Sequence, residues 1–306
     1  DMARGCIGRA HERLELSGLA AGEYYVSIDS WTDASGSIKD GAYSVAFEWI
    51  ADDEWTSVPV ADGITWSRLR ANDLMGGDQT VNLVEVERDH GWDIQPVDHG
   101  GCGRVPTKAS ALGARVAVNG GFFTSGCGTL DLLKVDGTLH STNSMTKEDE
   151  ETSAPVPIPQ RSIGWNAWGD VGFEWIANGV DWPGKRNAMG GFPSLVIAGV
   201  GYAYAEPGER VYSAGDWAKN PRTAVGVGGD GQLMMVTVDG RTSAGDGMST
   251  PDLAALMEDL GAMEAIGLDG GGSTTMVVRG CWIDSDIVNT PSDGTERSVG
   301  SGLYVL

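Results

Sequence analysis

The segment Ile266–Val278, IGLDGGGSTTMVV, carries the strongest chemical signal in the chain. An apolar stretch leads into Asp269, three glycines follow, and three hydroxyl residues precede a second apolar stretch. Because glycine lacks a Cβ atom, its backbone N–H groups can approach a ligand closely, and short hydroxyl side chains add further donors. The pattern predicts a strand end that binds an oxygen-rich ligand, a sugar or a phosphate. A tight turn in which Asp269 only caps the backbone is the alternative.

A second segment, Arg115–Phe123, repeats this order of residue types. Its sequence RVAVNGGFF gives a short apolar strand, then Asn119, then Gly120 and Gly121. A helix that ends at glycine is predicted before each of the two segments. We therefore expect Asn119 and Asp269 to lie at two strand ends that face one site, with the Asn119 amide bound to sugar hydroxyls or an N-acetyl group.

Motifs of several other enzyme classes do not fit this chain. Gly226-x-Gly228-x-x-Gly231 matches the dinucleotide fingerprint in letters, but a strand rather than a helix is predicted after it, so it indicates a hairpin turn. The sequence has no Walker A motif, no H-E-x-x-H and no G-x-S-x-G. The four histidines are scattered along the chain. We expect no metal site and no cofactor.

The chain is strongly acidic. Its 306 residues carry a formal net charge of −22 and the isoelectric point is about 4.3, which argues against nucleic acid or an anionic membrane as a partner. No apolar stretch approaches the roughly twenty residues that a membrane span needs. Since the net charge repels anions at long range, a bound phosphate needs local guanidinium groups. Arg222, Arg241 and Arg297 are the candidates, and the oligomeric state is not specified.

Residues 1–50 differ in pattern from the remainder. They alternate apolar and polar residues on either side of a turn or loop, and resemble the last strands of an accessory β-sandwich module. Asp29, Asp33 and Asp40 are more typical of a solvated loop than of a calcium site. Residues 60–306 are predicted to form the catalytic domain. Apart from the helix, glycine and strand pattern shared by the segments around Asn119 and Asp269, the chain shows no repeat with a period of 20–50 residues.

The domain from residue 60 onward is predicted to consist mainly of strands, with 46 glycines and 11 tryptophans in the chain as further signs of a β-rich enzyme. One helix is expected from Thr250, as N-cap, to Gly261, and another from Thr107 to Gly113. Glu148–Gln160 is expected to be a long surface loop, either a lid or an irregular excursion. The predicted strands are Thr80–Glu87, Arg115–Asn119, Leu130–Val135, Ser162–Asn166, Ser194–Ile197, Thr223–Val227, Leu233–Val238, Ala265–Leu268, Thr275–Val278 and Gly302–Leu306.

Four ordered motifs together resemble the phosphodiester glycosidase family, which includes the mannose 6-phosphate uncovering enzyme. They are Asn119–Phe123, Arg222–Arg241, Gly247–Val277 and Pro291–Val305. The resemblance runs from about residue 80 to the end of the chain. It implies an α+β fold with mixed β-sheets and few helices. It also implies hydrolysis of the anomeric C–O bond in a sugar 1-phosphodiester, as in N-acetylglucosamine-alpha-1-phospho-mannose glycans.

Such a reaction needs one carboxylate to stabilise an oxocarbenium-like centre or to activate water. The leaving phosphate departs readily when cationic and N–H donors stabilise its charge. Asp269 is the first candidate for this carboxylate and Asp239, in the VDGR turn, is the second, with turn capping as the alternative role of each. The groups expected to bind substrate or phosphate are Asn119, Gly120, Gly121, Arg222, Thr223, Arg241, Gly270, Gly271, Gly272, Ser273, Thr274 and Arg297.

Two other functions fit the same residues. A conventional glycoside hydrolase that acts on exopolysaccharide would need two essential carboxylates. A noncatalytic glycan-binding module would keep the pocket without the chemistry. The joint presence of Asp269, Arg222 and Arg241 favours a catalyst, because a simple binding module does not need all three. The partner expected is therefore a phosphorylated glycan or a sugar-phosphate diester.

The cysteine pattern indicates the compartment. The chain has four cysteines and no C-x-x-C metal pattern, which favours disulfides in a secreted or periplasmic protein. No signal peptide opens the chain, and Asp1 is expected to begin a processed, mature form. The family resemblance implies a disulfide between Cys102 and Cys127, on either side of the NGGFF motif. Cys6 and Cys281 are then the remaining pair.

Overall fold

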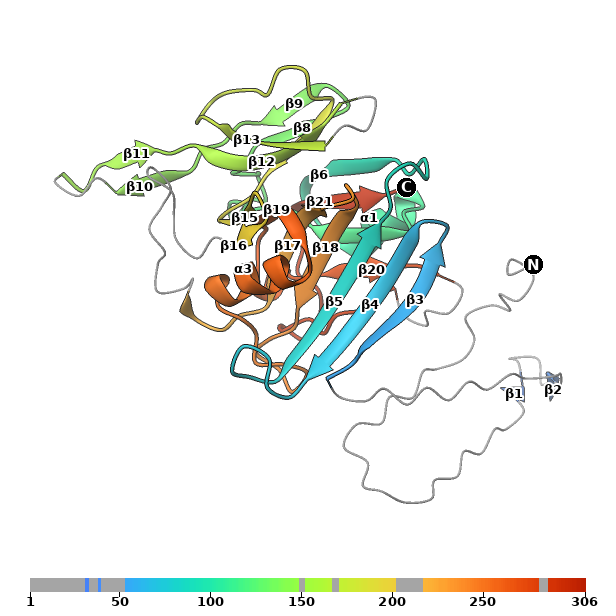
Figure 1. The fold of residues 1–306 in the computed structure, drawn as a ribbon. Helices are drawn as coiled ribbons and strands as arrows, with labels where there is room; N and C mark the ends of the chain where they lie inside the picture. The colour runs from blue at the N-terminus through green and yellow to red at the C-terminus, as the bar shows by residue number, and fades with distance from the viewer. Residues whose placement is uncertain are drawn as a thin grey trace.

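The computed structural model describes residues 31–32, 38–39, 53–148, 152–166, 171–201, 217–280 and 286–306. Within these ranges the helices are α1 (Val105–Leu112) and α3 (Thr250–Asp259), and Gly271–Ser273 forms a 3₁₀ turn, η2. The strands, labelled in Figure 1, are β1 (Trp31–Thr32), β2 (Ile38–Lys39), β3 (Trp55–Ala61), β4 (Ile64–Ala71), β5 (Gln79–Val86), β6 (Ile94–Gly103), β7 (Val116–Asn119), β8 (Leu133–Val135), β9 (Thr138–Ser141), β10 (Thr146–Glu148), β11 (Pro155–Pro157), β12 (Gln160–Trp165), β13 (Val171–Ile176), β14 (Asn187–Gly190), β15 (Ser194–Ile197), β16 (Val200–Gly201), β17 (Arg222–Gly228), β18 (Leu233–Val238), β19 (Ala262–Gly267), β20 (Met276–Val278) and β21 (Val299–Val305).

The largest sheet described has eight strands in the order β16-β15-β19-β17-β18-β5-β4-β3 (Figure 1). All six residues of β18 are buried, as expected for a central strand that is covered on both faces. The outermost strand, β3, alternates between exposed and less exposed residues and carries Pro59, which is typical of an edge strand. The glycines between β17 and β18 form the predicted hairpin turn, and Gly231 adopts a φ of +80° there.

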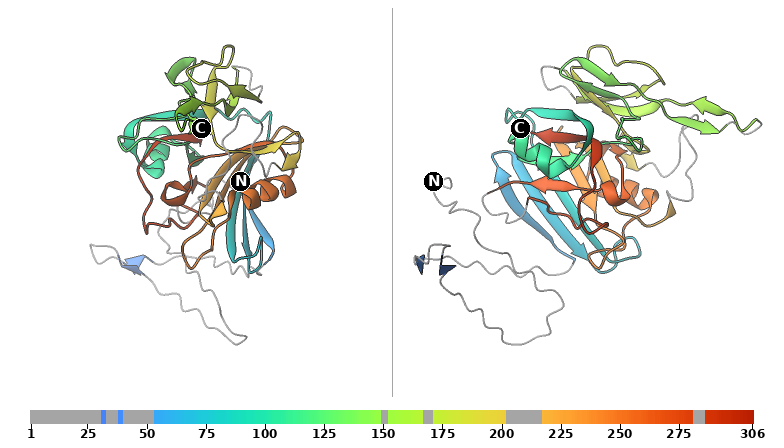
Figure 2. Two further views of the ribbon diagram at one scale, coloured as in Figure 1. Left: turned by 90° about the vertical axis from the view of Figure 1, so that its left-hand side faces the viewer. Right: turned by 180° about the vertical axis from the view of Figure 1, so that it is seen from behind.

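A four-stranded sheet in the order β20-β7-β21-β6 packs against the eight-stranded sheet (Figures 1 and 2). The main core lies between them and includes Trp66 and Met235 from the larger sheet and Val118 and Leu303 from the smaller one. This packing brings the end of β7 close to the ends of β17 and β19. The α+β class with few helices is confirmed. Mixed sheets would contain both parallel and antiparallel strand pairs. In the described residues the strand pairs are antiparallel, including those of the eight-stranded and four-stranded sheets.

The two helices cover the outer faces of these sheets. Helix α3 packs Leu253 and Met257 on the eight-stranded sheet, and α1 lies on the four-stranded sheet. The N-cap of α3 is Ser249 and not the predicted Thr250. Ser249 is the N-cap because its hydroxyl accepts the backbone N–H of Asp252. The Asp252 carboxylate in turn accepts the backbone N–H of Ser249, and the two hydrogen bonds form a capping box.

A five-stranded sheet in the order β13-β12-β14-β8-β9 lies across one end of the two larger sheets (Figure 1). The hairpin β10–β11 projects beside it, where a loop over Glu148–Gln160 was predicted. The prediction was wrong because Thr146–Glu148 pairs antiparallel with Pro155–Pro157 despite the prolines. A two-stranded ribbon has two free edges, so a missing proline N–H can face outward.

All ten predicted strands are present, Ser194–Ile197 and Leu233–Val238 with the predicted ends and the others with shifted ends, and several strands were missed. The missed strands include β3, β4, β6, β13 and β14. Near the N-terminus, Trp31–Thr32 pairs antiparallel with Ile38–Lys39, across most of the segment 32–40 that was predicted to be a turn or loop. The remainder of residues 1–50, with Cys6, Asp29, Asp33 and Asp40, lies outside the described residues. The accessory module there and the catalytic domain boundary at residue 60 stay predictions.

Candidate active site

A cavity of about 610 Å³ lies where β19 ends and β17 begins. Its walls come from these two strands, the η2 turn, the first turn of α3 and the residues around β10. Such a volume suits a small organic ligand. The described residues that line it are Phe122, Leu130, Ser144, Met145, Thr146, Phe192, Pro193, Asn220, Arg222, Thr223, Arg241, Thr250, Leu253, Gly267, Leu268, Asp269, Gly270, Gly271, Gly272 and Arg297.

Asp269 is the carboxylate among these lining residues. It follows β19 and is half-buried. Burial raises the pKa of Asp269 above its ordinary value, and three contacts act in the opposite direction: a hydrogen bond from Ser273, the charge of Arg297 and the N–H of Gly270. A partly desolvated carboxylate with a cation beside it is the usual environment of a catalytic acid or base.

Three arginines converge on the same cavity, as the sequence predicted. The Nε atom of Arg222 donates to the carbonyl of Met248 over 2.8 Å, and both Nε and Nη2 of Arg241 donate to the Asn220 side chain, over 3.0 and 2.6 Å. Arg297 forms an ion pair of 2.7 Å with Asp293. Because these contacts fix each guanidinium plane at the cavity wall, the site is prepared for an anionic group such as a phosphate.

The glycines after Asp269 were expected to offer free N–H groups to a ligand. Their main effect in the structure is to let neighbouring protein segments pack closely against the turn. The N–H of Gly271, whose φ is +60°, donates to the carbonyl of Pro221 over 2.9 Å. A Cβ atom on Gly270 would lie 2.7 Å from that same carbonyl oxygen, and one on Gly272 would overlap the Arg297 guanidinium. Glycine is therefore required here so that the backbone of the β17 entry and the arginine can approach the turn.

Asn119 has a different role from the expected contact with sugar. It is fully buried, and its Nδ2 atom donates to the carbonyl oxygens of Gly120 and Asp269 over 3.0 and 2.7 Å. Its Oδ1 atom accepts the Thr223 hydroxyl over 2.9 Å and the Thr275 N–H over 3.1 Å. These four bonds use the full capacity of a side-chain amide. Asn119 therefore positions the site from beneath and does not line the cavity.

Four other predicted binding residues also lie beneath the cavity surface. Gly120 packs against Ser301 and Gly121 against Asp131, where no Cβ would fit. Ser273 and Thr274 are buried, Ser273 as the last residue of the η2 turn and Thr274 directly after it. Neither residue lines the cavity. The predicted residues that line the cavity are Arg222, Thr223, Arg241, Asp269, Gly270, Gly271, Gly272 and Arg297.

A profile described as phosphodiester glycosidase matches residues 112–306, which is more than half of the chain. The chain belongs to the phosphodiester glycosidase family. N-acetylglucosamine-1-phosphodiester alpha-N-acetylglucosaminidase of Mus musculus is 28% identical over 214 residues, which are 65% of this chain and 38% of that protein. The SPbeta prophage-derived uncharacterized protein YomE of Bacillus subtilis is 42% identical over 87 residues, which are 28% of this chain and 13% of that protein. The chain thus spans less than half of the length of either relative.

Solved structures share the fold of this phosphodiester glycosidase at low sequence identity. The catalytic domain of zebrafish N-acetylglucosamine-1-phosphodiester alpha-N-acetylglucosaminidase, auto-inhibited by its pro-peptide, superposes with a TM-score of 0.61 at 20% identity, over 82% of this chain and 87% of that chain. A hypothetical protein from Synechocystis gives a TM-score of 0.58 at 17% identity, over 82% and 63% of the two chains. Within the described residues, no helix is long and apolar enough to cross a bilayer.

Asp239, the second candidate for the catalytic acid, lies outside the cavity of this phosphodiester glycosidase. It is fully buried, and both carboxylate oxygens accept the backbone N–H of Thr290 at 3.0 Å. Burial raises the pKa of Asp239 to about 6, against the lowering effects of the Thr290 contacts and of Arg68 and Arg70. The carboxylate therefore anchors the loop that leads to Arg297 and has no access to substrate.

Asp131 is a residue of the site that the sequence analysis missed. It is buried and accepts the backbone N–H of Phe122 and the side-chain amide of Gln160. Burial raises the pKa of Asp131 to about 7, and the charge of Asp269 contributes to the increase. The signal available in the sequence was one acid inside the apolar run LDLLKV, shortly after NGGFF. An acid at a buried position needs a partner or a function.

The disulfide between Cys102 and Cys127, which the family resemblance implied, is present. It joins the end of β6 to the turn that follows NGGFF. Cys281 lies outside the described residues, as Cys6 does, so their pairing stays a prediction. The hairpin base also contributes to the site, because Ser144, Met145 and Thr146 line the cavity. The interpretation of this hairpin as a lid stays a prediction.

Proposed function

We propose that this protein hydrolyses the anomeric C–O bond of a sugar 1-phosphodiester and releases free sugar and a phosphomonoester. The observation that carries the proposal is the convergence of Asp269 with Arg222, Arg241 and Arg297 on one cavity. The lining offers three guanidinium groups for the phosphate and one carboxylate for the anomeric carbon. The names of the mouse and zebrafish relatives support an N-acetylglucosamine 1-phosphodiester as the substrate class. The family resemblance adds a phospho-mannose glycan as the other partner of that diester.

In this proposal the guanidinium groups hold the phosphate and stabilise the charge that develops as it leaves. Because the leaving phosphomonoester is already a weak base, no separate acid is needed at its oxygen. The Asp269 carboxylate stabilises the oxocarbenium-like carbon or takes a proton from the attacking water. Phe192 and Pro193 line the same cavity and supply an apolar wall for the face of the sugar or for an N-acetyl methyl group.

A conventional glycoside hydrolase is a weaker fit to this geometry. That mechanism uses two carboxyl groups on opposite sides of the scissile bond. Among the described lining residues, Asp269 is the one carboxylate. The neighbouring Asp131 is buried and already accepts the Phe122 N–H and the Gln160 amide. The arginine-rich wall also favours a phosphate over a neutral glycosidic oxygen.

The test is the release of free sugar from UDP-N-acetylglucosamine and from an N-acetylglucosamine-phospho-methylmannoside. Asp269→Asn preserves size and removes the charge, so kcat should fall by a factor on the order of a thousand with an unchanged melting temperature. Arg222→Lys should lose the planar two-point contact with phosphate and weaken both kcat and KM.

Three outcomes would overturn the proposal. Near-normal kcat in a folded Asp269→Asn variant would remove the carboxylate from the mechanism. Binding of either diester to the wild-type protein without release of sugar would instead identify a glycan-binding module. Cleavage of a neutral exopolysaccharide but of neither diester would favour the conventional hydrolase.

We also propose that the protein acts in an oxidising compartment, secreted or periplasmic. The Cys102–Cys127 disulfide supports this placement, because such bonds persist where thiols are not kept reduced. Recovery of this bond intact from protein made in its native host, by mass mapping of nonreduced peptides, is the expected result. Free thiols at both positions would contradict it.

A further inference from the structure

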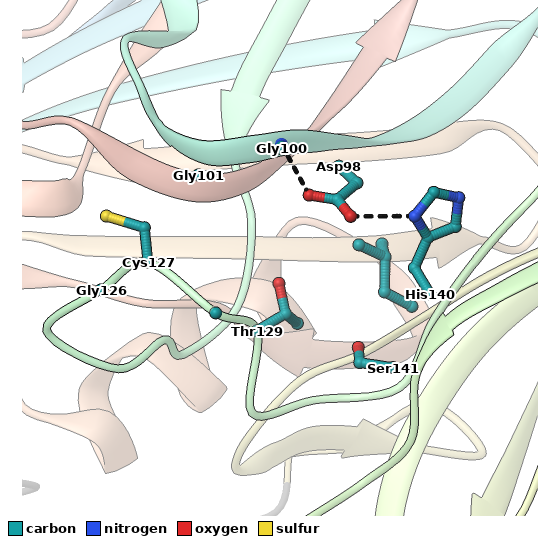
Figure 3. Close-up of a pocket in the computed structure, with 10 residues that line it drawn as sticks. Asp98, Gly100, Gly101, Gly126, Cys127, Thr129, His140 and Ser141 are labelled. Atoms are coloured by element: carbon teal, nitrogen blue, oxygen red, sulfur yellow. Dashed lines mark hydrogen bonds and ion pairs between the residues drawn. The ribbon is translucent and has the colours of Figure 1, made fainter.

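A second cavity, of about 310 Å³, lies on the other side of the segment Thr129–Asp131 from the catalytic pocket. Figure 3 shows its walls, which come from the turn in β6, the turn around Cys127 and strand β9. The two cavities share no lining residue, yet Thr129 lines this one and its neighbour Leu130 lines the other. This volume is at the small end of the range for ligand pockets and suits a single sugar ring.

The polar centre of this cavity is the pair Asp98 and His140. The Nδ1 atom of His140 lies 2.8 Å from Oδ2 of Asp98, and their side chains are 33% and 32% exposed (Figure 3). The backbone N–H of Gly100 donates to the other carboxylate oxygen over 2.8 Å. Burial opposes ionisation, but the contacts from Gly100 and His140 lower the pKa of Asp98 overall. The carboxylate is therefore ionised and fixed in direction at the cavity wall.

The glycines in the wall leave room for a ligand. Gly100 and Gly101 adopt φ angles of +70° and +127°, so their backbone conformation accounts for the residue type. Gly126 and Gly128 have no such φ, and a Cβ at either would come no closer than 3.4 Å to another atom. Neither strain nor packing requires glycine at these two positions. The absence of side chains at Gly126 and Gly128 leaves space along this part of the cavity wall.

The chemistry of the wall selects a neutral polyol. Each Asp98 oxygen has one contact and keeps a lone pair that can accept a hydroxyl group. Thr129 and Ser141 add hydroxyls elsewhere on the wall, and the Ser141 hydroxyl, which already donates to the Asp131 carbonyl, can still accept. The permanent charge among the lining residues is that of Asp98, which repels a phosphate and accepts from vicinal hydroxyls. The catalytic pocket, with its three arginines, has the opposite preference.

We propose that this cavity is a second carbohydrate-binding site, which accepts one neutral sugar residue through the Asp98 carboxylate and takes no part in bond cleavage. It is named here the Asp98 site. Its place on the far side of Thr129–Asp131 would let the protein hold a glycan at a point other than the scissile phosphodiester. The inference does not depend on the reaction in the catalytic pocket.

The experiment measures binding of methyl α-mannoside and of N-acetylglucosamine by changes in the amide NMR signals of Gly100, Gly101 and Gly128. Asp269→Asn protein serves as the background, so that turnover plays no part. We expect saturable changes with a Kd of roughly millimolar for at least one of the two sugars. Unchanged signals at these glycines with both sugars would overturn the proposal.

Two variants test the assignment of the site. Gly126→Leu should fill the cavity without strain and abolish the changes at Gly100, and an unchanged melting temperature would verify its fold. Asp98→Asn should weaken binding by about tenfold, the effect of a lost hydrogen bond to a charged group. Asp136→Asn, which alters an exposed carboxylate paired with Arg186, is the matched control and should bind as the wild type does. Equal binding by Gly126→Leu and wild type would place the sugar elsewhere and refute the Asp98 site.

Discussion

The Nδ2 atom of Asn119 donates a hydrogen bond of 2.7 Å to the main-chain oxygen of Asp269. The Oδ1 atom of the same amide accepts the N–H of Thr275 over 3.1 Å. One side chain at the end of β7 therefore holds both ends of the glycine-rich turn. Since β7 belongs to the four-stranded sheet and Asp269 follows a strand of the eight-stranded sheet, the amide also sets the spacing of the two sheets at the site.

Replacement of Asn119 by alanine should therefore damage both stability and catalysis. The change leaves buried partners on Gly120, Asp269, Thr223 and Thr275 without their hydrogen bonds, and each such group costs about 1–3 kcal/mol. We expect a loss of at least about 3 kcal/mol in unfolding free energy, measured by urea denaturation, and a lower kcat in the folded fraction.

The control for Asn119→Ala is Asn82→Ala. Asn82 is equally buried, but it lies in β5 and accepts the Trp66 indole N–H, away from the catalytic cavity. The Asn82→Ala variant should have a lower free energy of unfolding and the kcat of the wild type. If Asn119→Ala also kept a wild-type kcat, the amide would be a general core residue and not a positioning residue of the site.

Asp239→Asn should lower stability more than kcat, whereas Asp269→Asn should lower kcat and leave stability unchanged. Asp239 accepts the Thr290 N–H with both oxygens, and weakening a hydrogen bond to a charged group costs about 1.5–3 kcal/mol. Thermal denaturation should therefore show a lower melting temperature, while kcat at low temperature falls by less than about tenfold. A loss of kcat as large as that of Asp269→Asn, at unchanged stability, would return Asp239 to the catalytic role.

Arg297 should tune the pH at which Asp269 becomes active. The charge of Arg297 lowers the pKa of Asp269, in opposition to burial, which raises it. Arg297→Gln removes the lowering effect, so the pKa rises and the acidic limb of kcat/KM should move to higher pH. Arg186→Gln, at an exposed pair with Asp136, is the matched control. An acidic limb that stays in place in Arg297→Gln would show that Asp269 does not control it.

The elements that carry the site could be predicted from local sequence. Short apolar runs before Asn119 and Asp269 gave the strands β7 and β19, and a proline next to a hydroxyl residue gave the start of α3. The need for local arginines was predicted from the charge, because a phosphate in an acidic protein needs local cations. These signals depend on neighbouring residues in the chain, and they identify which residues matter better than they identify how each one acts.

The remaining features depend on contacts between distant segments. Asn119 is buried because β7 and β20 pair beneath the turn, and the letters NGG do not distinguish a buried amide from one that faces a ligand. Asp131 acquires its role from Gln160, 29 residues away. Likewise, Asp98 and His140 meet only because β6 and β9 approach each other from different sheets. No local pattern encodes these pairs.

Catalysis should not require a divalent cation, because guanidinium groups can stabilise the leaving phosphate in its place. Arg222, Arg241 and Arg297 all line the cavity beside Asp269. Exhaustive treatment with EDTA should leave kcat unchanged in the diester assay. Loss of activity that calcium or magnesium restores would contradict this expectation and would make the carboxylates near the site ligands.

The buried carboxyl of Asp131 should give the protein an unusual dependence of stability on pH. Its pKa is raised to about 7 by burial and then by the charge of Asp269, whereas an exposed Asp in the unfolded chain has a pKa of about 3.9. Between these two values the folded state holds a proton that the unfolded state has released. Asp131 therefore contributes stability below about pH 4, and this contribution is lost as the pH rises to about 7.

Asp131→Asn tests this linkage because the amide does not titrate. The melting temperature of the wild type minus that of the variant should fall as the pH is raised from about 4 to about 7, and level off above that. Asp239→Asn should give the same trend ending near pH 6, since burial raises the pKa of Asp239 to about 6. A difference that grows with pH would mean that the folded state prefers the charged form of Asp131. In that case the effects of burial and of the Asp269 charge would be outweighed by the hydrogen bonds from Gln160 and Phe122.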